Sequence, residues 1–220
     1  LMVFTVPEPV RKGGTRPQGY PLREVLGFVW QARGLHGPLL AGVLLLALMR
    51  SGFSAWMPAF YERTYGWGPE VIGPLQGTAS LFAILLGLVA GTRLTEWLGK
   101  RRDDANLRVL FLANMLALPL LIVAPLMPTP WLALGCMVTG GAIGVMGGPG
   151  FSAAIQITTP NEMRAQITVM YAASITALGG SLGPSTVGLL TDFVWQSEAD
   201  LRYALLTIMV VFGPLAVYSI

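Results

Sequence analysis

Residues 38–60 read PLLAGVLLLALMRSGFSAWMPAF, and Arg50 is the one charged side chain in this stretch. An α-helix needs about 20 predominantly apolar residues to cross the hydrocarbon core of a bilayer. The stretch has that length, and it lacks the alternation of apolar and polar residues that marks a strand. It therefore predicts a membrane-spanning helix.

Comparable apolar stretches follow along the rest of the chain, separated by loops that contain Pro, Gly and charged residues. Together they predict an all-α membrane protein with six transmembrane helices. The expected spans cover residues 38–60, 71–94, 107–126, 131–157, 163–190 and 203–220.

The composition agrees with a lipid environment, because 54% of the residues are hydrophobic and 11% are charged. Soluble domains carry roughly 25% charged residues. One cysteine, Cys136, and one histidine, His36, provide neither a disulfide nor a set of metal ligands, so we expect no metal and no cofactor. The net charge of +3 is modest and does not indicate nucleic-acid binding.

The basic residues are unevenly distributed between the loops, and this distribution predicts orientation. With six spans, eleven of the 14 Lys and Arg residues lie on the side of the polar segment before the first span, against Arg63 and Arg202 on the other side. That segment, residues 7–33, is rich in Pro and Gly and is expected to be a cytoplasmic linker. Residues 22–32 are expected to form a short helix on the membrane surface.

Residues 94–102, LTEWLGKRR, lie between the second and third expected spans. They resemble the major facilitator loop signature G-x-L-a-D-r-x-G-r-r, which stands between spans two and three of each six-helix half. Glu96 takes the acidic position, Gly99 the turn glycine, and Lys100 and Arg101 the basic pair. In three places the signature is not followed: Glu replaces Asp, Trp97 replaces a basic residue, and the leading glycine is displaced to Gly91.

Further stretches are similar to the spinster-like transporters of that superfamily. They are WMPAF at 56–60, YGWGPEVIG at 65–73, TPNEMRA at 159–165, GP at 183–184, GLLTD at 188–192, LRYAL at 201–205 and VPEPVR at 6–11.

The resemblance implies a C-terminal half of a 12-helix major facilitator fold. Residues 1–36 would hold the end of span six and the cytoplasmic central linker, and residues 37–220 the bundle of spans 7–12. Both ends look like cuts through helices, so we expect a fragment of a longer protein. Its partner would be an N-terminal six-helix half, missing here, and its location a bacterial inner membrane.

Arg50 lies 12 residues after Pro38, which is roughly 18 Å along a helix and near the middle of the membrane. A charge at that depth costs at least about 2.5 kcal/mol, so Arg50 should face a partner or a water-filled cavity. Substrate binding, a structural ion pair and snorkelling remain open, and no acid in the six spans lies at a matching depth.

Other polar residues within the spans are candidates for a substrate cavity. In the family the cavity is lined by spans 7, 8, 10 and 11, so the resemblance ranks Gln76, Gln156, Tyr171 and Ser174 above Asn114. Each of them alone could equally form an interhelical hydrogen bond.

The resemblance implies that the signature residues Glu96, Gly99, Lys100 and Arg101, with Arg164, form a cytoplasmic gate. The alternative is a loop whose basic residues only keep it on the cytoplasmic side. We expect Gly99 to allow a tight turn with positive φ. Glycines also punctuate the fourth and fifth spans, where they allow close helix packing or bending during transport.

The resemblance implies a secondary active transporter that works by alternating access. Its substrate would be an anionic or amphipathic organic solute or a lipid-like molecule. Proton coupling is usual in such a family, and the coupling carboxylate would then belong to the missing half. A non-transporting membrane scaffold or sensor is the alternative. A membrane-embedded enzyme is disfavoured, because no deep carboxylates or Ser–His pair are present, and no catalytic residue is expected.

Overall fold

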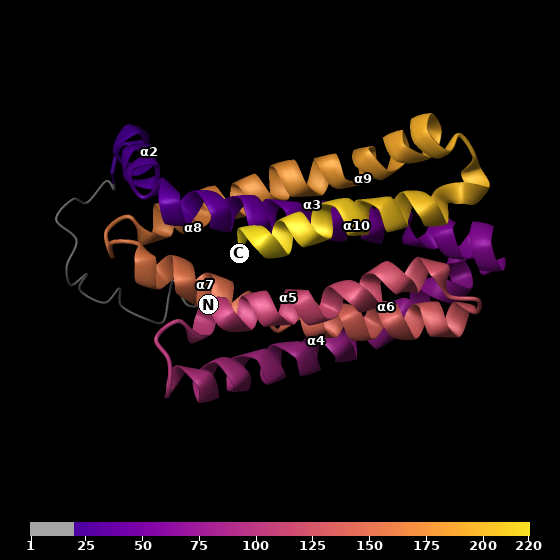
Figure 1. Ribbon diagram of the computed structural model, residues 1–220, viewed down its shortest axis with the longest axis horizontal. Helices are drawn as coiled ribbons and strands as arrows, with labels where there is room; N and C mark the ends of the chain where they lie inside the picture. The colour runs from indigo at the N-terminus through magenta and orange to yellow at the C-terminus, as the bar shows by residue number, and fades with distance from the viewer. Residues whose placement is uncertain (1–19) are drawn as a thin grey trace, which may run out of the picture.

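The computed structural model describes residues 20–220, and every regular element in this range is helical (Figure 1). The α-helices are α2 (Leu22–Gln31), α3 (Arg33–Tyr65), α4 (Pro69–Gly99), α5 (Ala105–Val123), α6 (Pro130–Val145), α7 (Gly148–Thr158), α8 (Arg164–Ser174), α9 (Gly180–Leu189) and α10 (Leu201–Ser219). Shorter 3-10 segments cover Ala124–Leu126 and Glu198–Asp200, and π-helical segments cover Ile175–Gly179 and Leu190–Trp195.

Five stretches within this range are long and apolar enough to cross a membrane: Arg33–Tyr65, Pro69–Gly99, Ala105–Leu126, Pro130–Thr158 and Leu201–Ser219. The expectation of an all-α membrane protein is confirmed, and five of the six expected spans meet this criterion. The fifth expected span, residues 163–190, does not, because the π-helical segment Ile175–Gly179 divides it into α-helices of 11 and 10 residues.

Helix boundaries follow from local chemistry. α3 ends at Tyr65, and the next residue, Gly66, has a φ of 70° in the left-handed region that glycine tolerates best. α4 begins with Pro69, which lacks the N–H that would go unpaired in a first turn. The break between α6 and α7 precedes Pro149 in the same way. Thr129 caps α6 by accepting a hydrogen bond from the backbone N–H of Leu132.

The helices form two groups. In one, α3 packs against α9 and α10; in the other, α4, α5, α6 and α7 pack together, and α5 joins the groups by contacting α10 (Figure 1). Glycines permit the closest approaches. A Cβ atom on Gly52 of α3 would lie 2.8 Å from the carbonyl oxygen of Gly183 in α9, and Gly87 and Gly91 of α4 meet the backbone of α6 and its end in the same way.

α9 is an irregular helix that α3 supports by hydrogen bonds. Pro184 has no N–H to donate to the preceding turn, and the Ser51 hydroxyl donates to the carbonyl oxygen of Gly179 in that turn. The indole Nε1 of Trp56 donates to the carbonyl oxygen of Pro184 at 2.9 Å. Such side-chain donors replace the backbone bonds that an interrupted membrane helix loses.

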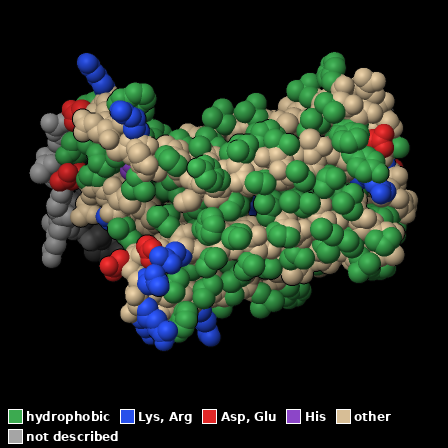
Figure 2. Space-filling model, in the orientation of Figure 1, with side chains coloured by type: hydrophobic (Ala, Val, Ile, Leu, Met, Phe, Trp, Pro, Cys, Tyr) green, Lys and Arg blue, Asp and Glu red, His purple; other side chains and the backbone are tan. Residues whose placement is uncertain are grey.

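The two ends of the bundle differ in character. Figure 2 shows Lys and Arg side chains gathered at the end where α2 and the α4–α5 loop lie, with a largely apolar surface along the middle of the bundle. The opposite end carries an aromatic cluster of Tyr61, Tyr65, Trp67 and Trp131, in which the Tyr65 hydroxyl donates to the carbonyl oxygen of Met127 at 2.7 Å. Aromatic rings of this kind are typical of a membrane–water interface.

Candidate functional site

Arg50 lies near the middle of α3, which runs from Arg33 to Tyr65. At about 1.5 Å per residue, each end of the helix is more than 20 Å away. Residues spaced three, four and seven positions from Arg50 share its helix face. With Arg50, they line two hollows of the bundle. They are Val43, Leu46, Ala47, Phe53, Ser54 and Met57.

The guanidinium of Arg50 reaches from the α3 group of helices to the α4–α7 group. Its Nη2 atom occupies the space that a Cβ atom on Gly144 of α6 would take. The glycine therefore leaves room for the charged group beside the α6 backbone. The position of Arg50 thus depends on two helices that are distant in the sequence.

A pocket of about 130 Å³ opens beside Arg50 between α3, α4 and α6. Ser54, Gln76 and Ser80 supply its other polar side chains, and its remaining lining is mostly apolar: Phe53, Met57, Leu121, Met137, Val138, Gly141 and Met209. A mostly apolar pocket with a few convergent polar groups is typical of small-molecule sites.

A second hollow of about 270 Å³ extends from Arg50 toward the basic end of the bundle. Asn114 of α5 lines it, together with Phe151 of α7 and Ile175. The Asn114 amide donates to the carbonyl oxygen of Leu110 at 2.8 Å, and the side chain is 5% exposed. Arg50 therefore stands at the junction of two hollows.

Within residues 20–220 the structure records neither a hydrogen bond nor an ion pair for Arg50. The acidic residues of this range lie near helix ends, in loops or on α2, far from the level of Arg50. A charge in the middle of a bilayer is unfavourable unless it faces a partner or a water-filled cavity, and Arg50 borders two hollows.

Three of the expected cavity residues lie away from this pocket. Gln156 is exposed on α7, and Ser174 is half-buried on α8, with its hydroxyl donating to the carbonyl oxygen of Met170 at 2.8 Å. Tyr171 is 1% exposed and packs with Val25, Ile155 and Ile167. The structure thus brings together Arg50 and Gln76 and leaves the other three outside the hollows around Arg50.

Tyr171 forms a buried pair with His36. The Tyr171 hydroxyl donates to the carbonyl oxygen of His36 at 3.1 Å, and it lies 2.8 Å from His36 Nδ1. Because the Tyr171 hydroxyl uses its hydrogen in the bond to the His36 carbonyl oxygen, His36 Nδ1 must carry a hydrogen and donate it to the Tyr171 oxygen. His36 Nε2 is buried and has no hydrogen-bond partner among the described residues. The pair joins α3 to α8 near the basic end.

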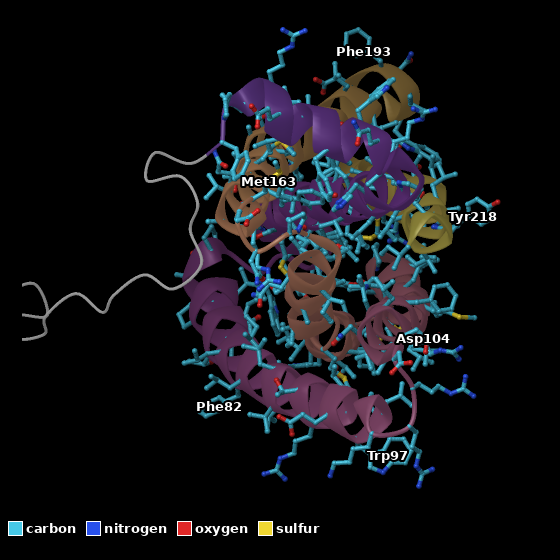
Figure 3. All side chains as sticks on the ribbon, turned by 90° about the vertical axis from the view of Figure 1, so that its left-hand side faces the viewer. Phe82, Trp97, Asp104, Met163, Phe193 and Tyr218 are labelled. Atoms are coloured by element: carbon cyan, nitrogen blue, oxygen red, sulfur yellow. The ribbon has the colours of Figure 1, made fainter. Side chains whose placement is uncertain are left out.

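The expected gate residues lie at the basic end but are not joined to one another. Glu96, Lys100 and Arg101 are exposed, and the Arg101 guanidinium lies 4.9 Å from the ring centre of Trp97. Figure 3 looks along the bundle from this end and places Trp97 and Asp104 far from Met163, the residue before Arg164. Arg164 instead donates to the carbonyl oxygen of Thr159 at 3.5 Å.

The expectation for Gly99 is wrong in its geometry. α4 continues through Gly99, and Gly66 is the one glycine with positive φ among the described residues. The turn lies just after Gly99, around Lys100 and Arg101. There the backbone N–H groups of Arg101 and Arg102 both donate to the carbonyl oxygen of Leu98. The six preceding residues of the signature are therefore helical.

The same loop ends in a local ion pair. Arg108 Nε donates to Asp104 at 2.6 Å, one helical turn earlier. This hydrogen bond holds the pKa of the Asp104 carboxyl below its usual value. Asp104 therefore stays ionised and fixes the first turn of α5.

Sequence reasoning missed Ser54 and Gly144, and it ranked Asn114 low. Ser54 could have been found, because it lies four residues after Arg50 and so shares its helix face. Gly144 and Asn114 carry no such signal, since their proximity to Arg50 depends on how α6 and α5 pack against α3.

Comparisons with known proteins agree with this architecture. The family profile described as Major Facilitator Superfamily matches residues 1–184. An MFS-type efflux pump of Mycolicibacterium smegmatis is 28% identical over 154 residues, which cover 70% of this chain and 36% of the pump.

The fold is also similar to a solved structure, a bacterial homologue of the human lysosomal transporter Spinster in an inward-facing, unoccupied conformation. The TM-score is 0.67 at 17% sequence identity, and the match covers 95% of this chain and 50% of that one. The chain thus spans half or less of the length of these two relatives.

Proposed function

Because the chain belongs to the Major Facilitator Superfamily, we propose that it forms the C-terminal half of a secondary transporter that works by alternating access. Its family is one of multi-pass membrane transporters rather than enzymes. In this proposal the helical run 164–195 is the fifth of six spans despite its π-helical segments. An N-terminal half of the same fold would complete the substrate site at the midplane.

The observation that carries this proposal is the environment of Arg50. A permanent charge in the middle of the bundle, without a partner in residues 20–220, borders a mostly apolar pocket with Gln76 and Ser80. Arg50 would attract the anionic group of a solute, and Phe53 and Met137 would contact its apolar part. The substrate class is then an anionic or amphipathic organic solute, including lipid-like molecules.

The basic end is the cytoplasmic end in this proposal. Lys100 and Arg101, with Arg93, Arg102 and Arg108, follow the positive-inside rule there. Among residues 20–220, the other end has only Arg63 and Arg202 as basic residues. Glu96, Gly99, Lys100, Arg101 and Arg164 would then contact the N-terminal half when the cytoplasmic side closes. One relative is named an efflux pump, which supports export as the first direction to test.

The test is transport by the full-length protein in proteoliposomes, with and without a pH gradient, against a panel of amphipathic anions. We expect Arg50→Ala to reduce the rate at least tenfold, which corresponds to about 1.4 kcal/mol of lost stabilisation. Arg102→Ala, an exposed arginine of the α4–α5 loop, is the matched control and should transport normally. Normal transport by Arg50→Ala would reject the cavity role, and no transport of any solute by the parent would favour a scaffold or sensor.

A further inference from the structure

α2 crosses the end of the bundle instead of continuing along it. In Figure 1 this helix lies at the basic end and is turned away from the long axis of the spans, next to the start of α3. If the spans cross the membrane, α2 lies near the membrane surface. Its position is held by Val25, which is 1% exposed and packs with Ile155, Ile167 and Tyr171.

The apolar residues of α2 form one continuous arc around the helix. At about 100° per residue, Phe28, Val25 and Val29 occupy one half of this arc, and Leu22, Leu26 and Trp30 the other half. The bundle covers the first half. The second half is open: Leu22 is 71% exposed, Leu26 53% and Trp30 69%.

The rest of the helix circumference is polar. Arg23, Glu24 and Gln31 are exposed there, and Gly27 lies between them. The guanidinium of Arg33 lies 5.3 Å from the ring centre of Trp30, at the edge of the apolar half that the bundle leaves open. An apolar arc with a tryptophan at its edge, bordered by arginines, is typical of helices that lie in the interface of a bilayer.

We propose that Leu22, Leu26 and Trp30 insert into the lipid of the cytoplasmic leaflet and that Arg23 and Arg33 bind anionic phospholipid headgroups there. The charge distribution around α2 favours lipid over a protein partner. Arg23 and Arg33 both lie beside Trp30, at one edge of the open apolar half, and their end of the bundle carries most of the basic residues. Anionic lipids of the inner leaflet complement this charge. This inference rests on the proposed orientation but not on transport.

Its consequence is an anchor on the start of α3. Phe28 of α2 packs edge-on against His36 at 5.8 Å between ring centres, and His36 in turn contacts Tyr171 of α8. Lipid that holds α2 at the interface therefore also restrains the start of α3, the helix that carries Arg50.

The experiment measures the depth of spin labels on the full-length protein, with its native cysteines, Cys136 included, replaced by alanine. Labels at Leu26→Cys and at Gln31→Cys compare the apolar arc with the polar arc of the same helix. In vesicles of phosphatidylcholine and phosphatidylglycerol, we expect the Leu26 label to be relaxed mainly by oxygen and the Gln31 label mainly by a water-soluble nickel complex.

Two outcomes would overturn the insertion. One is a Leu26 label as accessible to the nickel complex as the Gln31 label, which would place α2 in water. The other is a Leu26 label shielded from both reagents, which would mean that protein covers this face.

The headgroup contact is tested by removing the phosphatidylglycerol. We expect the Leu26 label to become shallower in phosphatidylcholine alone and the double variant Arg23→Gln/Arg33→Gln to lose this dependence on lipid charge. Equal depth in both lipid mixtures for the parent would overturn the role of the two arginines. These readouts do not require transport, so a failed transport assay leaves them interpretable.

Discussion

The guanidinium of Arg50 on α3 occupies the space beside the Gly144 backbone of α6 that any larger side chain at residue 144 would fill. This relationship connects the two groups of helices at the level of the pocket. It makes the position of the charge depend on a residue that carries no charge and no functional group.

We expect Gly144→Ala to displace the Arg50 guanidinium, because the new methyl group and Nη2 cannot share that space. Transport by the full-length protein should fall roughly tenfold, about 1.4 kcal/mol. Gly135→Ala is the matched control on the same helix, since a Cβ atom there meets nothing within 4 Å. Equal rates for both variants would show that the exact position of Arg50 is unimportant.

The contact between α3 and α9 predicts a stability effect. A Cβ atom on Gly183 would collide with Ser51 and with the backbone of Leu48 and Gly52, so Gly183→Ala should force the helices apart. Overpacking of this kind costs about 1–3 kcal/mol. Thermal unfolding in detergent measures the loss, with Gly180→Ala, which has open space, as the control. An unchanged unfolding temperature for Gly183→Ala would contradict this packing.

The buried pair of His36 and Tyr171 predicts a second loss of stability. Tyr171→Phe removes the hydroxyl that contacts both Nδ1 and the carbonyl oxygen of His36. A buried polar group left without a partner costs about 1–3 kcal/mol, measurable by the same unfolding assay. Tyr218→Phe is the control, because Tyr218 is 90% exposed. Equal stability of the two variants would mean that the pair contributes nothing.

The proposed orientation predicts which end of the bundle reacts with a thiol reagent added outside the cell. In intact cells, a membrane-impermeant thiol reagent should label Glu70→Cys at the start of α4 and leave Arg102→Cys unlabelled until the cells are opened. Both positions are exposed, so reactivity reports the side of the membrane and not burial. The opposite pattern would reverse the orientation.

Much of the architecture could be predicted from the apolar stretches, because a bilayer requires long helices whose backbone groups are paired internally. The π-helical interruptions of residues 164–195 could not be predicted in this way, because no apolar stretch reveals them; in the fold, α3 donates hydrogen bonds to the carbonyl oxygens of Gly179 and Pro184 in this region. The positive φ expected at Gly99 was wrong because α4 extends as a helix through this residue. The chain turns only after Gly99.

By itself, the sequence determined that this chain lies in a membrane, which end is basic, and that Arg50 lies at mid-depth, because hydrophobic length and charge position are properties of single segments. The tertiary structure alone decided which side chains surround Arg50. It placed Gln76, Gly144 and Asn114 beside the charge and put Tyr171 against His36. The physical reason is that these neighbours come from different helices, and close packing at glycines sets how those helices meet.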